Sequence, residues 1–118
     1  MMAMARRTSD GDRLLLVLGA LANPHRLRIV AALAEESTYV SQLARDLGLS
    51  RPLLHMHLQR LQAAGLITDR MEISDDGKAM RWVAVTDFAL QLDAASIAAA
   101  APTLTDPPSA DGRTKGKN

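Results

Sequence analysis

Residues 38–67 carry the clearest hydrophobic pattern in this chain, with apolar positions at helical spacing on both sides of Gly48. Before that glycine, four apolar residues recur at i, i+3, i+4 and i+7, as one face of a helix requires: Val40, Leu43, Ala44 and Leu47. Glycine adopts left-handed backbone most easily, so Gly48 predicts the end of this helix and a tight turn after it.

A second helix is predicted directly after the turn. Ser50 has a hydroxyl that can cap the first turn, and Pro52 falls where a missing backbone N–H costs little. The buried stripe is expected at Leu54, Leu58 and Leu61. Gly65 ends the helix. Two helices joined in this way form a helix-turn-helix, whose second helix enters the DNA major groove. A generic helical hairpin is the alternative, but the caps and the turn glycines favour the helix-turn-helix.

Two further helices precede this motif. Residues 14–21 are apolar nearly all round, so this first helix must bury two sides. Asn23 and Pro24 provide the N-cap and the first-turn residue of a second helix. Its inward stripe is expected at Leu27, Val30, Ala31 and Ala34, widened by Ile29 and Leu33.

The apolar period changes after Gly65, from that of a helix to that of a strand. Two alternating stretches, residues 66–73 and 80–85, flank the polar turn 74–77. This arrangement predicts a β-hairpin, which is the wing when it follows a helix-turn-helix.

A last helix is expected over residues 88–101, capped by Thr86 and Asp87. Like the first helix, it has more apolar circumference than one small core can cover. The surplus on both helices predicts a two-fold homodimer. The residues expected at this interface are Leu14, Leu15, Val17, Leu18, Leu21, Leu90, Ala94 and Ile97.

The predicted fold is mainly α with a β-hairpin wing: a winged helix-turn-helix of four helices, two strands and a fifth helix. The domain is expected to cover residues 11–101, between a flexible N-terminal arm at 1–10 and a disordered tail at 102–118. The tail is rich in Pro, Gly and polar residues and has no periodicity.

The composition argues against several other classes of protein. The chain of 118 residues has no cysteine, and no apolar run is long enough to span a membrane. The N-terminus lacks a signal-peptide pattern, so a cytoplasmic protein is expected. No nucleophile with a base and an orienting group is evident, and no glycine-rich phosphate loop, which argues against an enzyme. The net charge is only +1, so any attraction for DNA must be local.

The residues predicted to contact DNA lie on the helix-turn-helix and the wing: Ser41, Gln42, Ser50, Arg51, Pro52, Leu53, His55, Met56, Gln59, Arg60, Lys78 and Arg81. Arg51 begins the second helix and is expected to read a base, whereas Arg60 is expected to contact a phosphate at the rim. His55 faces either DNA or solvent. His57, near the buried stripe, is expected to be a core or helix-contact residue rather than a metal ligand.

The wing leaves two alternatives open. Trp82 is expected in the core rather than stacked on DNA. Asp75 and Asp76 at the tip would repel phosphate, so the wing either stays clear of the DNA backbone or turns its tip outward while Lys78 and Arg81 approach.

Several runs of sequence resemble one known family. The run Leu21–Val30, LANPHRLRIV, is similar to the LADPTRLRIL opening of the ArsR-type winged-helix repressors. Residues 43–50, together with Leu58 and Leu61 and the run 64–67, resemble that family's helix-turn-helix and its exit into the wing. The resemblance covers roughly residues 12–100. It implies a homodimeric transcriptional regulator, usually a repressor that an effector releases from DNA.

Metal-sensing members of that family carry a Cys-Val-Cys type of box at the start of the third helix. The matching positions here are Tyr39, Val40 and Ser41, and the last helix has no histidine for the family's other kind of metal site. No metal and no cofactor are therefore expected, although a site from His25 and carboxylates across a dimer stays open.

The prediction is a homodimeric repressor that binds an inverted repeat in double-stranded DNA, with an unknown effector. A winged-helix protein–protein interaction module without DNA binding is the alternative.

Overall fold

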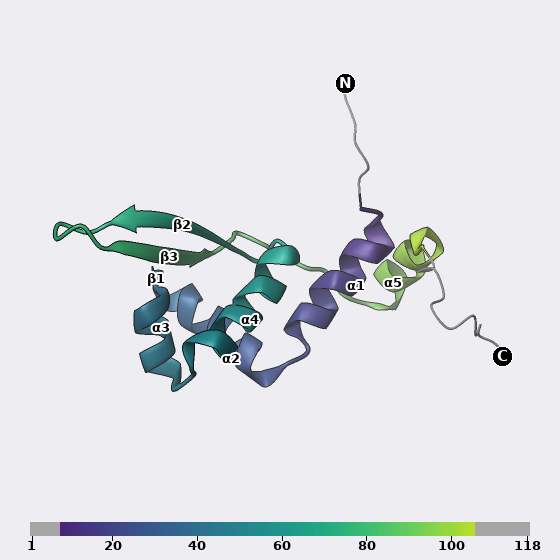
Figure 1. Ribbon diagram of the computed structural model, residues 1–118. Helices are drawn as coiled ribbons and strands as arrows, with labels where there is room; N and C mark the ends of the chain where they lie inside the picture. The colour runs from purple at the N-terminus through teal and green to yellow at the C-terminus, as the bar shows by residue number, and fades with distance from the viewer. Residues whose placement is uncertain (1–7, 106–118) are drawn as a thin grey trace, which may run out of the picture. The chain divides into compact units, whose positions relative to one another are not determined.

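The computed structural model describes residues 8–105, which form two compact units (Figure 1). The larger unit is Leu15–Leu90, and the smaller one contains the described residues 8–14 and 91–105. Most of the predicted N-terminal arm and residues 106–118 of the predicted tail lie outside the described residues. Within the described chain, no single helix is long and apolar enough to cross a membrane, and the one pair that passes together, the first two helices, is bent by 92°.

The order of elements is that of a winged helix-turn-helix, as predicted. The elements are α1 (Asp10–Leu21), α2 (Pro24–Glu35), β1 (Thr38–Tyr39), α3 (Val40–Leu47), α4 (Arg51–Ala63), β2 (Ile67–Ile73), β3 (Ala79–Val85), α5 (Ala94–Ala100) and the 3-10 helix η2 (Ala101–Thr103). In the larger unit, β2 and β3 form a long hairpin that projects beyond the helices (Figure 1).

The predicted caps and turns of the helix-turn-helix are confirmed. Oδ1 of Asn23 accepts hydrogen bonds from two backbone amides at the start of α2, and Oγ of Ser50 accepts one from Leu53 at 3.3 Å. Gly48 ends α3 in left-handed backbone with φ of 66°. These local interactions fix the angle at which α4 leaves the turn.

The sheet contains a third strand that the sequence pattern did not predict. β3 lies in the middle, with β2 on one side and β1 on the other, all antiparallel. In β1, Thr38 pairs with Val83 and Tyr39 pairs with Trp82. A strand of two residues has no alternation to detect, and its partner is distant in sequence. Its effect is to tie the start of α3 directly to the wing.

The inward face of α2 differs from the predicted one. Ile29 and Leu33 are buried, whereas Leu27 is 53% exposed and Ala31 and Ala34 are also exposed. The predicted stripe was wrong at these positions because it left Arg26 out of account. Its Nε donates to the carbonyl oxygen of Ala20 at 2.7 Å, so this charged side chain belongs to the inward face.

The larger unit is built around fourteen buried apolar residues: Val17, Ala20, Ile29, Leu33, Val40, Leu43, Ala44, Leu54, Leu58, Leu61, Ala64, Leu66, Ile67 and Val83. The predicted stripe of α4 is among them. Val17 is only 5% exposed, so its predicted place at a dimer interface is wrong: its side chain is already used by the core.

The last helix begins later than predicted. Thr86 does not cap a helix, because its amide and hydroxyl donate to the carbonyl oxygens of Leu66 and Gly65 and continue the wing. Phe88 packs against the core without helical structure. The actual cap is Asp93, whose Oδ1 accepts from the amide of Ser96 at 2.7 Å in a capping box.

The smaller unit joins the start of α1 to residues following α5. The amide of Gly11 donates to Oγ1 of Thr103 at 2.6 Å, and Thr105 donates to the carboxylate of Asp12 through its amide and its hydroxyl. The two hydrogen bonds from Thr105 lower the pKa of Asp12. Residues 102–105 of the predicted disordered tail therefore make defined contacts.

Candidate nucleic-acid interface

An open groove of about 500 Å³ lies between the helix-turn-helix and the wing. The residues that line it come from α3, α4, β2, β3 and the turn of the hairpin, and they include Arg45, Arg51, His55, Lys78 and Arg81. No Asp or Glu is among the lining residues. The groove is therefore a local concentration of positive charge in a chain whose net charge is +1.

The first turns of α4 form one wall of the groove. Arg51 is the first residue of the helix and is exposed, and His55 follows four residues later on the same face. Both side chains line the groove. Ser50 caps the helix and Pro52 lies in its first turn. The backbone from which Arg51 and His55 project is therefore fixed by local interactions.

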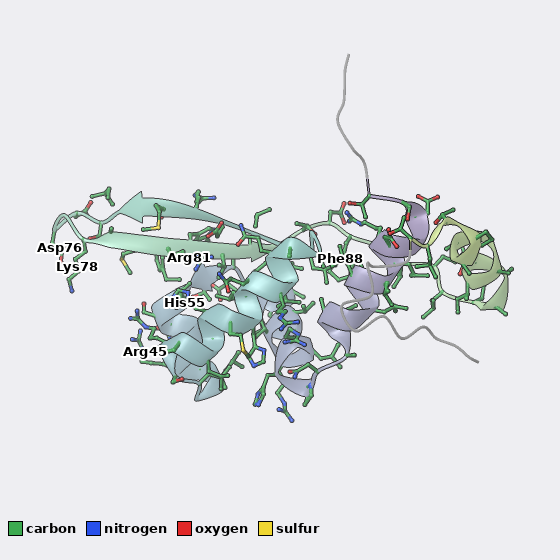
Figure 2. All side chains as sticks on the ribbon, turned by 45° about the vertical axis from the view of Figure 1, so that its right-hand side comes forward. Arg45, His55, Asp76, Lys78, Arg81 and Phe88 are labelled. Atoms are coloured by element: carbon green, nitrogen blue, oxygen red, sulfur yellow. The ribbon has the colours of Figure 1, made fainter. Side chains whose placement is uncertain are left out.

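Arg81, on β3, lines the groove on the side of the wing (Figure 2). Its Nη1 lies 2.9 Å from Nδ1 of His55, and its Nε forms a salt bridge of 2.5 Å with Asp69. Gln62 completes the network, since it accepts from Arg81 and donates to Asp69 at 2.9 Å. Arg81 therefore lines the groove, but its guanidinium is largely engaged by protein groups.

The α3 side of the groove carries Arg45, which the predicted contact set omitted. Ser41 also lines the groove, whereas Gln42 does not. Gln42 instead accepts from Arg45 and donates to Asp46, both at 2.7 Å. The missed signal was helical spacing: Arg45 is four residues after Ser41 and shares its face.

The structure places Arg60 away from the groove. It lines a separate hollow of about 190 Å³ together with Leu15, Leu16 and Gly19 of α1. Arg60 follows Arg51 by two and a half helical turns, so the two side chains leave α4 on opposite sides. Arg60, the expected phosphate contact at the rim, therefore does not share the lining of this groove with Arg51.

The remaining predicted residues of α4 are exposed outside the groove lining. They are Pro52, Leu53, Met56 and Gln59. Leu53 is 38% exposed and Met56 is 42% exposed. They form the outward side of the helix, next to the side that carries Arg51 and His55.

The wing turn separates its charges. Lys78 lines the groove, whereas Asp75 and Asp76 are not among the lining residues. Figure 2 shows Lys78 and Asp76 at the turn of the hairpin. Asp76 accepts a hydrogen bond from the hydroxyl of Ser74, and this bond lowers the pKa of Asp76. Gly77 closes the turn with φ of 85°. Of the two alternatives for the wing, the one in which the acidic tip turns outward fits this geometry.

Trp82 lies on the face of the sheet opposite the core, so the prediction that it is a core residue is wrong. Val83 is buried, and alternation along β3 directs Trp82 the other way. Tyr39 meets the indole edge-on with ring centroids 4.9 Å apart, and the guanidinium of Arg70 lies 5.5 Å from its centroid. Tyr39 also donates to Glu72 at 2.9 Å, which raises the pKa of the tyrosine.

His57 is a core histidine, as predicted, with 3% of its surface exposed. Its Nδ1 lies 3.0 Å from Nη1 of Arg26, and its ring centroid lies 5.4 Å from that of His25. Burial, and then the charge of Arg26, lower the pKa of His57. Within residues 8–105, no three His, Asp or Glu side chains are placed to hold a metal ion.

Sequence relatives share the helix-turn-helix region. The pattern of the bacterial arsR regulatory protein family matches residues 23–69. An uncharacterised HTH-type transcriptional regulator of Methanocaldococcus jannaschii is 31% identical over 74 residues, which are 63% of this chain and 77% of that protein. The nodulation protein NolR of Rhizobium meliloti is 42% identical over 55 residues, which are 47% of this chain and 45% of NolR.

A solved structure shows the same arrangement beyond that region. It is the homodimeric winged helix-turn-helix DNA-binding domain of a possible ArsR-family regulator from Mycobacterium bovis. The match has a TM-score of 0.57 and 27% identity, and covers 70% of this chain and 75% of that one. With the motif at residues 23–69, the fold and these relatives in agreement, the chain belongs to the ArsR family of bacterial regulatory proteins.

Proposed function

We propose that this protein is a homodimeric transcriptional repressor that binds an inverted repeat in double-stranded DNA. The observation that carries the proposal is the groove between α4 and the wing, lined by Arg45, Arg51, Lys78 and Arg81 and by no carboxylate. Helix N-termini attract phosphate, and α4 begins at the groove with Arg51. DNA is a polyanion that such a groove suits in charge.

The proposed contacts divide into two kinds. Arg51 is the candidate for base reading, because a guanidinium can form a bidentate pair with guanine in the major groove. Arg45 and Lys78 are candidates for phosphate, which would add affinity without sequence preference. The other proposed contacts are Ser41, Gln42, Ser50, Pro52, Leu53, His55, Met56 and Gln59. Arg60 is left out because of its place beside α1.

The proposed dimer interface uses the apolar residues of the first and last helices. Leu15 is 63% exposed and Ile97 is 46% exposed. Leu90 is exposed as well, in the irregular segment that precedes α5. The remaining candidates are Leu14, Leu18, Leu21 and Ala94. Exposed apolar side chains in such numbers favour a partner surface, and the M. bovis domain carries the description homodimeric.

A regulator of this kind would work in the cytoplasm, where bacterial DNA lies, and the proposal includes no cofactor and no membrane. The test is binding of the purified protein to the promoter of its own operon and to scrambled DNA, at two salt concentrations. A preference for the promoter that persists at the higher salt is expected. Equal, strongly salt-sensitive binding to both DNAs would contradict sequence-specific regulation, and no binding to either would favour the interaction module.

A further inference from the structure

We propose that Arg81 is a positioning residue that fixes His55 as a hydrogen-bond donor toward DNA. The proposal deepens the proposed function and rests on it. It follows from one juxtaposition: Nη1 of Arg81, on β3, lies 2.9 Å from Nδ1 of His55, on α4, at the wall of the groove. His55 thereby becomes a DNA-contacting residue whose donor atom is set by the wing.

The chemistry of the two groups allows only one assignment of the proton. A guanidinium has donors and no acceptor, and it stays charged in proteins. Arg81 must therefore donate, and Nδ1 of His55 must carry a lone pair. A neutral imidazole with a free Nδ1 has its proton on Nε2. The hydrogen bond thus selects the Nε2–H tautomer.

Arg81 is itself held in place by two other elements. Asp69 on β2 accepts from its Nε at 2.5 Å, and Gln62 on α4 accepts from its Nη2 and donates to Asp69 at 2.9 Å. The salt-bridged side chains of Arg81 and Asp69 are 23% and 24% exposed, so water reaches them only in part. The imidazole is therefore oriented before DNA arrives, and little side-chain freedom remains to be lost on binding.

The other ring nitrogen of His55, Nε2, is not engaged by protein groups within residues 8–105. It has no hydrogen-bond partner among the residues that the structure describes. In that same part of the chain, only Nε2 of His57 is both buried and unpartnered. The Nε2–H of His55 is therefore free to donate to a ligand at the groove, which His55 lines together with Arg51. Its ligand is an acceptor on DNA, either N7 or O6 on a purine edge or a phosphate oxygen.

The tautomer can be measured without DNA. In nitrogen-15 NMR of the imidazole at mildly alkaline pH, Nδ1 of His55 should show the shift of an unprotonated nitrogen and Nε2 that of a protonated one. Arg81→Met should give a mixture of tautomers. Arg70→Met removes an equal charge from the other face of the sheet and should leave His55 unchanged. A wild-type His55 with its proton on Nδ1 would overturn the proposal.

DNA binding tests the donor role with a matched pair of variants. The amide nitrogen of glutamine can occupy the place of Nε2, whereas that of asparagine reaches only the place of Nδ1. His55→Gln should keep most of the operator preference, and His55→Asn should lose affinity by about three- to tenfold, the value of one hydrogen bond. Equal affinities for wild type and His55→Asn would overturn the donor role even if the tautomer is as proposed.

Two further comparisons separate the possible outcomes. Replacing purines of the operator by 7-deaza analogues removes N7, so a smaller effect of His55→Asn on that DNA assigns the contact to a base edge. An unchanged effect, shared with scrambled DNA, assigns it to phosphate. If the wild-type protein binds no DNA, the proposed function and the donor role fail together, and the NMR measurement still decides whether Arg81 sets the tautomer.

Discussion

Nη1 of Arg26 donates to Nδ1 of His57 across 3.0 Å, and this contact joins α2 to the buried side of α4. Arg81 makes the corresponding contact with His55 from the wing. Residues two apart on a helix leave it on nearly opposite sides. Two histidines on different sides of α4 therefore each accept a hydrogen bond from an arginine on another element.

The burial of His57 predicts acid sensitivity of the fold. The pKa of His57 is lowered, chiefly by burial, from its usual value of 6.5. The unfolded chain then binds a proton at higher pH than the native state does, so the free energy of unfolding should be greatest above that value and fall as the pH drops through the native pKa. Urea unfolding followed across this range measures the effect. His57→Asn keeps an acceptor for Arg26 without a titratable ring, and a slope as steep as the wild type's in that variant would contradict the assignment.

Two glycines of α1 should respond oppositely to alanine. A Cβ on Gly11 would lie 2.5 Å from the carbonyl oxygen of Ala100. Gly11→Ala should therefore destabilise the packing of the start of α1 against residues 100–104 by about 1–3 kcal/mol. A Cβ on Gly19 meets nothing within 4 Å, so Gly19→Ala should stabilise the helix by roughly 0.5–1 kcal/mol. Thermal unfolding of both variants provides the comparison, and a stabilised Gly11→Ala protein would show that this packing is absent in solution.

Arg51 and Arg60 should differ in their effect on DNA binding. Arg51→Ala should reduce preference for the operator over scrambled DNA by about 1–3 kcal/mol. Arg60→Ala should leave that preference and the salt dependence nearly unchanged, because Arg60 lines the hollow beside α1 instead of the groove. Competition binding on both DNAs tests this. A loss of operator preference in Arg60→Ala, equal to that in Arg51→Ala, would contradict the position of the groove.

The proposed dimer can be tested with two exposed leucines. Leu15 is 63% exposed on α1 and Leu27 is 53% exposed on α2. Leu15→Glu should shift the protein from dimer to monomer in sedimentation experiments, because it buries a charge in the interface. Leu27→Glu adds the same charge at a similar exposure outside that interface and should stay dimeric. A wild-type protein that is monomeric at micromolar concentration would exclude the dimer itself.

Local chemistry explains which parts of the fold could be predicted from sequence. Asn23, Ser50 and Gly48 act within a few residues of their own positions, so their roles are visible in the chain alone. The inward face of α2 depends instead on acceptors supplied by Ala20 and His57, which no helical period reveals. Likewise, the hydroxyl of Thr86 could have capped a helix, but it donates a hydrogen bond to the carbonyl oxygen of Gly65 instead.

The candidate site shows the same division. Helical spacing alone puts Arg51 and His55 on one face of α4, and both line the groove. The engagement of Arg81 by Asp69 could not be predicted, since it depends on the register between β2 and β3. Trp82 was misplaced because alternation along a strand identifies two faces without saying which one is buried.

The central place of β3 has a consequence for how the protein acquires its activity. β1 precedes α3, yet it can pair only with β3, which follows α4. Contacts between segments so distant in the chain form late, because closing a long loop costs entropy, whereas α3 and α4 can associate from contacts close in sequence. A nascent chain halted after Ala63 would therefore contain α4 but not the groove, because the wing that lines its other side is still missing. The groove that we propose to bind DNA can form only after β3, which pairs with both β1 and β2, has been synthesised.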